Sequence, residues 1–430
     1  MRAFGIHRLI EQCLCEDNTQ NAPPNQRLHP LLTMPRPSST TAVSESLFVD
    51  LLPLMTAVFL AFSVIGLALP VLPLHVHDDL GLGTFFVGLV TGAQFAASLL
   101  SRVAAGRLSD TRGAKTAMQI GFVMASSSGV LYLVSLACTD APMLSLAVLL
   151  GGRGVLGAAE SFIITGALSW GLAAVHSTHS GKVISWIGTA MYAAFAAGAP
   201  VGSALFGALG FVSIGIATTV VPLLALALVA RRPGVSVAAS AGQPRAAPVL
   251  RGVWLPGVGL AFSSIGFGAI TAFIALHFST QGWTPVWLAF TAFACAFIAA
   301  RVLLGHLPDR LGGARVAFYF VLVEGAGQLL LWLANGPGMA LSGAVLTGLG
   351  YSLVYPGLGI VAVARVPSQS RGMAMGAYTA FLDLALGIAT PILGLFAGWT
   401  SLRQVFLVSA ICTLCSAAIA GFALRPSAKP

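Results

Sequence analysis

Twelve apolar runs of about 20 residues follow one another along this chain, separated by short polar or turn-rich breaks. A helix needs about 20 mainly apolar residues to cross the roughly 30 Å hydrocarbon layer of a membrane. We therefore predict an all-α integral membrane protein with twelve membrane-spanning helices. The runs cover residues 47–73, 84–106, 116–137, 143–168, 183–208, 211–230, 253–278, 284–305, 316–334, 339–363, 373–397 and 403–424.

The composition supports a membrane protein and excludes other classes. Apolar residues make up 57% of the chain and charged residues only 8%, whereas soluble domains average about 45–50% and 25%. A soluble enzyme, a nucleic-acid-binding protein and a disordered protein are therefore excluded. A β-barrel is excluded as well, because its strands alternate apolar and polar residues and these runs do not. The 49 glycines predict closely packed helices.

The distribution of basic residues predicts the orientation in the membrane. Of the 22 Lys and Arg residues, Arg153 lies inside a span and Arg403 falls on one side; all the others fall on the opposite side. Cytoplasmic loops carry an excess of Lys and Arg. Both termini are therefore predicted to be cytoplasmic, and the net charge of +9 reflects topology rather than a nucleic-acid partner.

The breaks between the runs predict the domain organisation. Residues 47–230 and 253–424 form two groups of six spans, joined by a flexible cytoplasmic linker at 231–252 that is rich in Pro, Gly, Ala and Ser. Residues 1–46 and 425–430 are predicted cytoplasmic tails. Met34 is a candidate alternative start, in which case residues 1–33 are dispensable or not translated.

An internal repeat relates the two groups of spans. Residues 101–115 read SRVAAGRLSDTRGAK and residues 300–315 read ARVLLGHLPDRLGGAR. Arg102 pairs with Arg301 and Asp110 with Asp309 at one common offset of 199 residues. Two six-span halves in parallel orientation are one of the known transporter repeats.

The repeated segment resembles the signature loop G-x-L-x-D-x-x-G-x-[KR] of the major facilitator superfamily (MFS). The first copy consists of Gly106, Leu108, Asp110, Gly113 and Lys115. The second copy consists of Gly305, Leu307, Asp309, Gly312 and Arg315, with its basic residue one position later.

Two further motifs resemble the same superfamily. Arg153 and Gly157 in the fourth run resemble its R-x-x-x-G motif. Gly198, Pro200 and Gly202 in the fifth run resemble the helix-bending glycine–proline motif of its exporters, with one residue between glycine and proline. The segments RGVLGAAES, GYSLVYPGLG and YTAFLDLALG resemble a bacterial group of sugar or drug exporters.

The resemblance covers residues 47–424 and implies a transporter rather than an enzyme. It implies two six-helix bundles that move a small molecule by alternating access, as a monomer in the bacterial inner membrane and without a cofactor. Proton-coupled efflux of a sugar-like or drug-like solute is the first expectation. Uptake by proton symport and a non-transporting receptor are the alternatives. The substrate, the direction of transport and the coupling ion stay open.

The repeated loops are a candidate gating latch. The Asp110 carboxylate can accept hydrogen bonds from free N–H groups at a helix N-terminus, where the helix dipole favours negative charge. Arg112 and Lys115 can tie the loop to the opposite half in one access state and release it in the other. The same loop in the second half contains Asp309 and Arg315. Alternatively, these charges serve only to orient the protein.

Three ionisable residues inside spans are candidates for proton coupling, because a charge inside a bilayer is costly and faces the bundle interior or a wet cavity. Arg153 and Glu160 lie on one face of the fourth run, seven residues apart, a rise of about 10.5 Å. Asp383 lies in the middle of the eleventh run. We predict Glu160 as the proton carrier before Asp383; the alternative is a structural pair of Arg153 with Glu160.

Hydroxyl and amide groups at cavity depth predict a hydroxylated or amphiphilic solute, although each of them can instead hydrogen-bond between helices. Glu324 is predicted to pair with Gln328 one turn further along its own span. No residue pattern predicts a metal site or a cofactor. The candidate substrate-binding residues are Gln94, Tyr192, Ser263, Tyr351, Tyr355 and Tyr378.

Overall fold

A computed structural model describes residues 40–175, 180–234, 246–367 and 370–423, and the regular structure in these ranges is entirely helical. In these ranges, eleven helical stretches are long and apolar enough to cross a membrane. A further apolar helix, α10 (Leu288–Leu304), is shorter. It occupies the predicted eighth span, so the described residues account for all twelve predicted spans.

The helices follow the order of the apolar runs. The first group consists of α2 (Thr40–Ala68), α3 (Leu72–Leu74), the π-helix η1 (His75–Asp79), α4 (Thr84–Arg112), α5 (Ala114–Leu136), α6 (Pro142–Ala173), α7 (Ser180–Leu209) and α8 (Phe211–Ala230). The second group consists of α9 (Ala246–Thr280), α10, α11 (Leu307–Leu311), α12 (Gly313–Leu333), α13 (Pro337–Ala364), α14 (Arg371–Trp399) and α15 (Leu402–Ala423).

The two copies of the signature segment form sharp turns between helices. Helix α4 continues to Arg112, so the turn before α5 is Gly113 alone, with φ of 94°. In the second copy Gly312 follows α11 with φ of 91°. Only glycine adopts such a positive φ without steric cost. The shared D-x-x-G spacing therefore places a glycine where each half needs the same turn.

The linker is shorter in the structure than the polar composition of residues 231–252 predicts. Helix α9 begins at Ala246, and Pro248 lies in its first turn, where a missing N–H costs little. Helix α9 has 35 residues, more than the about 20 that cross the hydrocarbon layer, so the apolar run marks only part of it. Residues 1–39, 235–245 and 424–430 lie outside the described ranges, and with them the C-terminal tail, the middle of the linker and most of the predicted N-terminal tail, of which residues 40–46 belong to α2.

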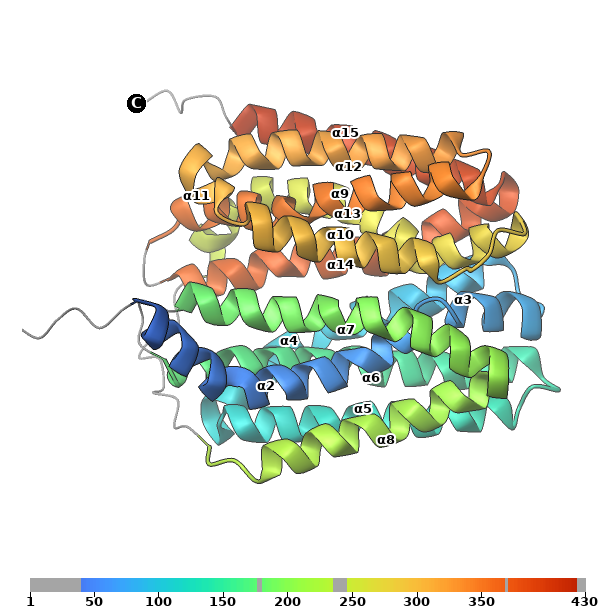
Figure 1. The fold of residues 1–430 in the computed structure, drawn as a ribbon, viewed down its shortest axis with the longest axis horizontal. Helices are drawn as coiled ribbons and strands as arrows, with labels where there is room; N and C mark the ends of the chain where they lie inside the picture. Colours follow the sequence, from blue (N-terminus) through green and yellow to red (C-terminus); the bar gives the residue numbers. More distant parts are fainter. Residues whose placement is uncertain (1–39, 176–179, 235–245, 368–369, 424–430) are drawn as a thin grey trace, which may run out of the picture. The chain divides into compact units, whose positions relative to one another are not determined.

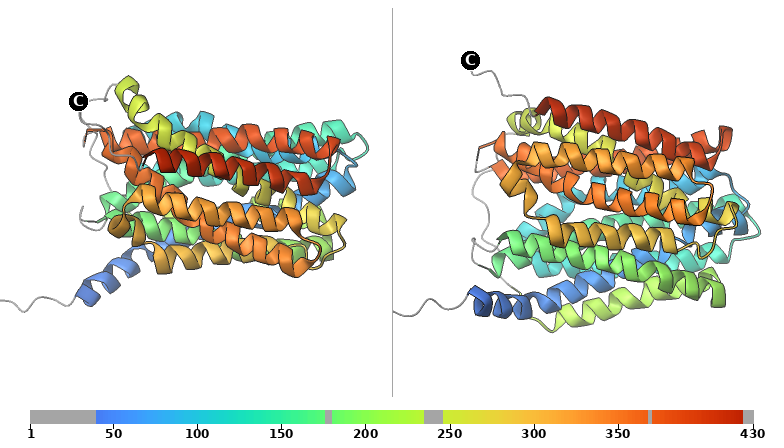
Figure 2. Two further views of the ribbon diagram at one scale, coloured as in Figure 1. Left: turned by 90° about the horizontal axis from the view of Figure 1, so that it is seen from above. Right: turned by 45° about the horizontal axis from the view of Figure 1, so that its top comes forward.

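Within residues 47–423, the helices pack in two groups. Helix α5 packs against α6 and α8, and α4 against α6, while in the second group α12 packs against α13 and α15, and α9 against α14 and α15 (Figure 1). The groups meet where α4 packs against α14 and α7 against α10. The two further views in Figure 2 show that the axes of these helices are roughly aligned with one another. The domain boundaries themselves stay predictions.

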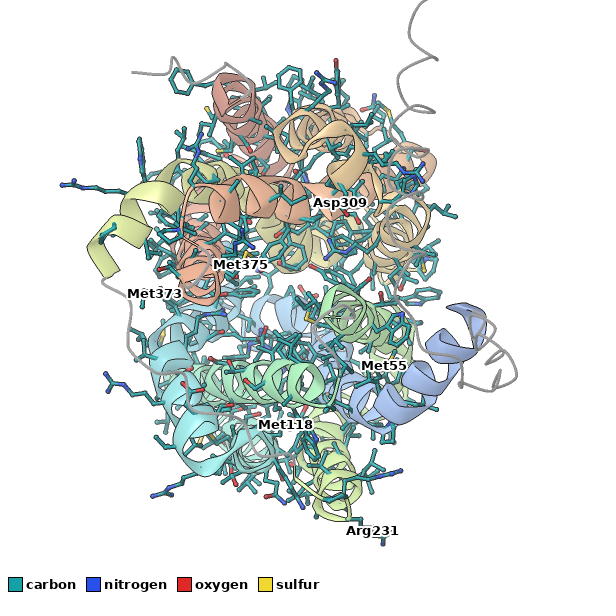
Figure 3. All side chains as sticks on the ribbon, turned by 90° about the vertical axis from the view of Figure 1, so that its left-hand side faces the viewer. Met55, Met118, Arg231, Asp309, Met373 and Met375 are labelled. Carbon is teal, nitrogen blue, oxygen red and sulfur yellow. The ribbon has the colours of Figure 1, made fainter. Side chains whose placement is uncertain are left out.

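The two ends of the helix groups can be told apart by the residues that lie there. Figure 3 looks along the helices from the end where α8 ends, and labels Arg231 and Asp309 there. We call this the linker end and the opposite one the far end. Lys115, at the start of α5, donates hydrogen bonds to carbonyl oxygens of Ala230 and Arg232. The C-terminal end of α4 therefore lies at the linker end, and Thr84, its first residue, lies at the far end.

Helices α4 and α14 make a tight seam toward the far end. Thr84 Oγ1 donates to the Gly394 carbonyl oxygen at 2.7 Å. Gly88 lies directly against the backbone of Thr390, where a Cβ atom would be 2.9 Å from the Cα of Pro391. Such close backbone approach requires glycine. We call this arrangement, in which α4 and α14 are in contact toward the far end, the sealed state.

Candidate functional site

A cavity of about 240 Å³ lies between the two helix groups. It is lined mainly by apolar and aromatic side chains with a few polar groups, which is the usual composition of a small-molecule site. Its polar and charged lining residues are Gln94, Arg102, Arg153, Glu160, Thr189, Tyr192, Thr271, Arg301, Tyr351, Tyr355, Thr379 and Asp383.

The Glu160 carboxylate is held by an amide. Gln94 Nε2 donates to Glu160 Oε2 at 2.7 Å. Gly157, one turn before Glu160 on α6, brings the two helices together, because a Cβ atom there would lie 2.7 Å from the carbonyl carbon of Gln94. The R-x-x-x-G glycine therefore has a physical role: it lets Glu160 reach Gln94.

The Asp383 carboxylate forms an ion pair that joins the two groups. Arg102 Nη2 on α4 donates to Asp383 Oδ2 on α14. The side chains are 23% and 5% exposed, respectively. Removing one member of a buried ion pair leaves the other charge without compensation, which is strongly destabilising. This pair therefore contributes to holding α4 against α14.

Arg153 is almost fully buried in the first group. Its Nε donates to the Val90 carbonyl oxygen at 3.3 Å, and its Nη1 donates to the Tyr132 hydroxyl at 3.4 Å. It makes no hydrogen bond or ion pair with Glu160 among the described contacts. The alternative of a structural pair between Arg153 and Glu160 is therefore not what this conformation contains.

Four of the six predicted substrate-binding residues line the cavity and two do not. The cavity-lining residues are Gln94, Tyr192, Tyr351 and Tyr355. Ser263 instead donates to Glu324 Oε2 at 2.5 Å, and the Tyr378 hydroxyl donates to the Tyr355 carbonyl oxygen at 2.9 Å. Both of these side chains join helices of the second group. Substrate contact by any of the six stays a prediction.

Glu324 does not pair with Gln328 as predicted. It is fully buried and accepts from Ser263 on α9, while Gln328 Nε2 donates to the Gly266 carbonyl oxygen of α9 at 3.2 Å. No hydrogen bond joins Glu324 and Gln328 among the described contacts. Both side chains turn toward the neighbouring helix rather than along their own, because that helix offers partners for buried polar groups.

The latch residues lie at the linker end without bonds between the two groups. Asp110 and Asp309 are exposed, and the structure gives neither side chain a hydrogen bond or ion pair in the described part of the chain. Arg112 and Arg315 are exposed as well. Lys115 caps the C-terminal carbonyl groups of α8, in its own half, rather than reaching the opposite one. A latch in the other access state stays a prediction.

The glycines of the predicted helix-bending motif pack against α2. A Cβ atom at Gly198 would lie 2.8 Å from the carbonyl carbon of Gly66, and one at Gly202 would lie 2.7 Å from the carbonyl carbon of Leu67. Pro200 lies inside helix α7, which is continuous through this motif. The motif therefore provides close contact between two helices, and bending in another state stays a prediction.

Two arginines of the cavity, Arg102 and Arg301, were missed as site residues by the sequence analysis, which assigned them to the basic loops. Arg301 Nη1 donates to the Ser352 carbonyl oxygen at 2.9 Å. A signal was present, because both lie inside apolar runs, where a charge is costly and usually functional. They therefore do not count toward the loop charge that predicts orientation.

Comparisons with known proteins identify the family. A sequence profile described as Major Facilitator Superfamily matches residues 54–313 and 257–430. An uncharacterised MFS-type transporter of Salmonella typhimurium is 43% identical over 384 residues, which cover 89% of this chain and 98% of that relative.

Solved structures share the fold. A bacterial homologue of the human lysosomal transporter Spinster, in an inward-facing and unoccupied conformation, matches with a TM-score of 0.68 at 15% identity, over 91% of this chain and 100% of that one. The fucose:proton symporter of Escherichia coli matches with a TM-score of 0.62 at 14% identity, over 88% and 100% of the two chains. The chain therefore belongs to the Major Facilitator Superfamily, as a multi-pass membrane transporter of small molecules and not an enzyme.

Proposed function

We propose that this transporter exports a small solute through the bacterial inner membrane in exchange for protons, acting as a monomer by alternating access. The observation that carries the proposal is one cavity between two helix groups in which two carboxyl groups, Glu160 and Asp383, lie among the polar lining residues. A charged residue in a membrane span is by default a candidate for proton or substrate translocation.

Glu160 is the better proton carrier of the two on geometric grounds. Its partner is the neutral Gln94 amide, so gain or loss of a proton rearranges one hydrogen bond and separates no ion pair. Protonation of Asp383 would instead give up its ion pair with Arg102, which joins α4 to α14. We assign the first proton to Glu160 and assign Asp383 a role in holding the two groups together.

The orientation follows from the loop charges that remain after Arg102 and Arg301 are set aside. Basic residues still concentrate at the linker end, so we place that end and both termini in the cytoplasm. With this orientation the α4–α14 seam lies toward the outside, and we propose that the cavity takes up its solute from the cytoplasmic side. The resemblance of the segment Gly198 to Gly202 to exporters supports outward transport.

The test uses proteoliposomes with an imposed pH gradient. Ligands are first found by thermal shift, where a ligand at 100 times its Kd adds about 2.7 kcal/mol of stability. Wild-type protein is expected to drive the solute against its gradient. Glu160→Gln keeps the side-chain size and a hydrogen bond to Gln94, so it is expected to lose proton-driven transport while solute counterflow continues.

Other outcomes assign a different function. Proton-driven transport in Glu160→Gln with an unchanged pH dependence would make Glu160 structural and transfer the proton role to Asp383. Solute and protons moving in the same direction would make the protein an uptake symporter. Specific binding without flux of any bound solute would favour a receptor.

A further inference from the structure

The charges that line the cavity are not balanced. Three arginines line it, at positions 102, 153 and 301, against two carboxylic acids, at positions 160 and 383. A buried charge is normally paired, because removing it from water is costly. Glu160 pairs with the neutral Gln94 amide, so Arg153 and Arg301 both lack a carboxylate among the described residues. The question is therefore which of these two arginines can accept a negative charge from a solute.

The contacts single out Arg301. Arg102 has its ion pair with Asp383. Arg153 has no carboxylate partner among the described residues, but it is almost fully buried in the first group, where it donates to the Val90 carbonyl oxygen and the Tyr132 hydroxyl. Arg301 donates one described hydrogen bond, to the Ser352 carbonyl oxygen, and no carboxylate of the described residues pairs with it. A guanidinium has five N–H donors arranged to hold a carboxylate with two bonds.

The internal repeat explains the missing partner. Helices α7 and α14 are the next-to-last helices of their groups, and each contains a proline, Pro200 and Pro391. We take these two prolines as equivalent positions of the repeat, which gives an offset of 191 residues. The same offset relates Tyr192 to Asp383. Arg102 and Arg301 are already related by the repeat. The counterpart of the Arg102–Asp383 pair is therefore Arg301 opposite Tyr192, where a neutral phenol replaces the carboxylate.

Contacts in the cavity support this equivalence. The Tyr192 ring stacks on Phe297, one turn before Arg301 on α10, with ring centroids 3.7 Å apart. Tyr192, Tyr351 and Tyr355 line the same cavity as Arg301. The cavity around Arg301 therefore contains phenols, which can hydrogen-bond to an anion but cannot neutralise the arginine at neutral pH.

We propose that the cavity binds an amphipathic organic anion, with its acidic group on the Arg301 guanidinium and its apolar body against the cavity's aromatic side chains. The apolar body would contact Phe95, Phe195, Phe267 and Phe297, all of which line the cavity. The Asp383 carboxylate is already paired with Arg102, and the proposed function gives the Glu160 carboxyl group the coupling proton, so neither is a free counter-charge for a cationic solute. This assignment of substrate class rests on the proposed function.

The experiment compares ligands that differ only in their head group. Purified full-length protein is tested by thermal shift and by isothermal titration with 4-phenylbutyrate, 4-phenylbutanamide and 4-phenylbutylamine. Two further series, one with an octyl chain and one with a naphthylmethyl group, each compare the acid, the amide and the amine. Within each series, the carboxylate is expected to stabilise the protein most.

Three variants locate the site. Arg301→Gln is expected to weaken carboxylate binding roughly 10- to 100-fold, the range for a lost hydrogen bond to a charged group, and Arg301→Lys to weaken it less. Tyr192→Asp places an acid at the repeat-equivalent position and is expected to abolish carboxylate binding. Arg310→Gln, which changes an exposed arginine on α11, is the matched control and should bind as wild type does.

The outcomes separate this proposal from the proposed function. The anion-site proposal would be overturned if the carboxylates stabilise the wild-type protein no more than their amides do. It would also be overturned if neither the carboxylates nor the amides stabilise the protein. Unchanged carboxylate affinity in a folded Arg301→Gln variant would overturn it too. Carboxylate binding at Arg301 without proton-driven flux would leave the anion site standing and refute the coupling. Proton-driven flux of an uncharged solute that persists in Arg301→Gln would support the coupling and refute the anion site.

Discussion

The seam between α4 and α14 allows a direct test of whether the protein alternates between this conformation and a second one in which the far end is open. Gly88 touches the backbone of Thr390, so Gly88→Ala places a methyl group where the sealed state has no room. Overpacking of this kind costs about 1–3 kcal/mol. The cost applies only while the far end is sealed, so the populations should shift roughly 5- to 150-fold toward the state with that end open.

The shift can be measured by labelling a single cysteine in the cavity. Ile65 lines the cavity, and Ile65→Cys is introduced into a chain whose six native cysteines are replaced by serine. A membrane-impermeant maleimide is added on the far side, and Gly88→Ala should increase the labelling rate. Gly207→Ala is the control, because a Cβ atom there meets no other atom within 4 Å.

An unchanged labelling rate in a folded Gly88→Ala variant would refute this reasoning. It would mean either that the helices part at this seam without cost or that the far end does not open. An equal increase in Gly207→Ala would also refute it, since the effect would then not depend on the contact between the two groups.

Three further predictions follow from particular contacts. Asp110→Asn should change the far-side labelling of the same cysteine while leaving the melting temperature unchanged; equal labelling would reduce the loop to a topology signal. Asp383→Asn leaves Arg102 without its partner and should lower stability by about 1–3 kcal/mol, less than for a fully buried pair because Arg102 is 23% exposed. Replacing both with Leu and Met should restore most of that loss in thermal unfolding. Gly157→Ala should destabilise by about 1–3 kcal/mol, whereas Gly154→Ala, whose Cβ would lie 4.0 Å from the nearest atom, should not; equal melting temperatures would contradict the role of close packing.

The fold could be predicted because the cost of placing polar backbone in lipid permits few solutions. Runs of about 20 apolar residues can only be spanning helices, so their number and order followed directly. The repeated D-x-x-G spacing marked the two loops, and the structure places in each a turn at a glycine, Gly113 or Gly312, with positive φ. Helix ends were less predictable, because helices such as α4 continue past the apolar run.

The site could be predicted only in part, because a sequence does not say which face of a helix meets the cavity. Gln94, Glu160 and Asp383 line it as their depth suggested, while Ser263, at similar depth, turns to Glu324. Arg301 was missed for a different reason. A basic residue near the end of a span can orient the protein or line a cavity, and only the three-dimensional arrangement distinguishes the two.

The central claim is that solute moves outward while a proton moves inward through Glu160. The most direct measurement follows a pH-sensitive dye trapped in proteoliposomes while a solute gradient is imposed without any pH gradient. Solute leaving through the wild-type protein should drive protons in the opposite direction, and Glu160→Gln should move solute down its gradient with no proton signal. Solute movement through the wild-type protein without a proton signal would contradict the account.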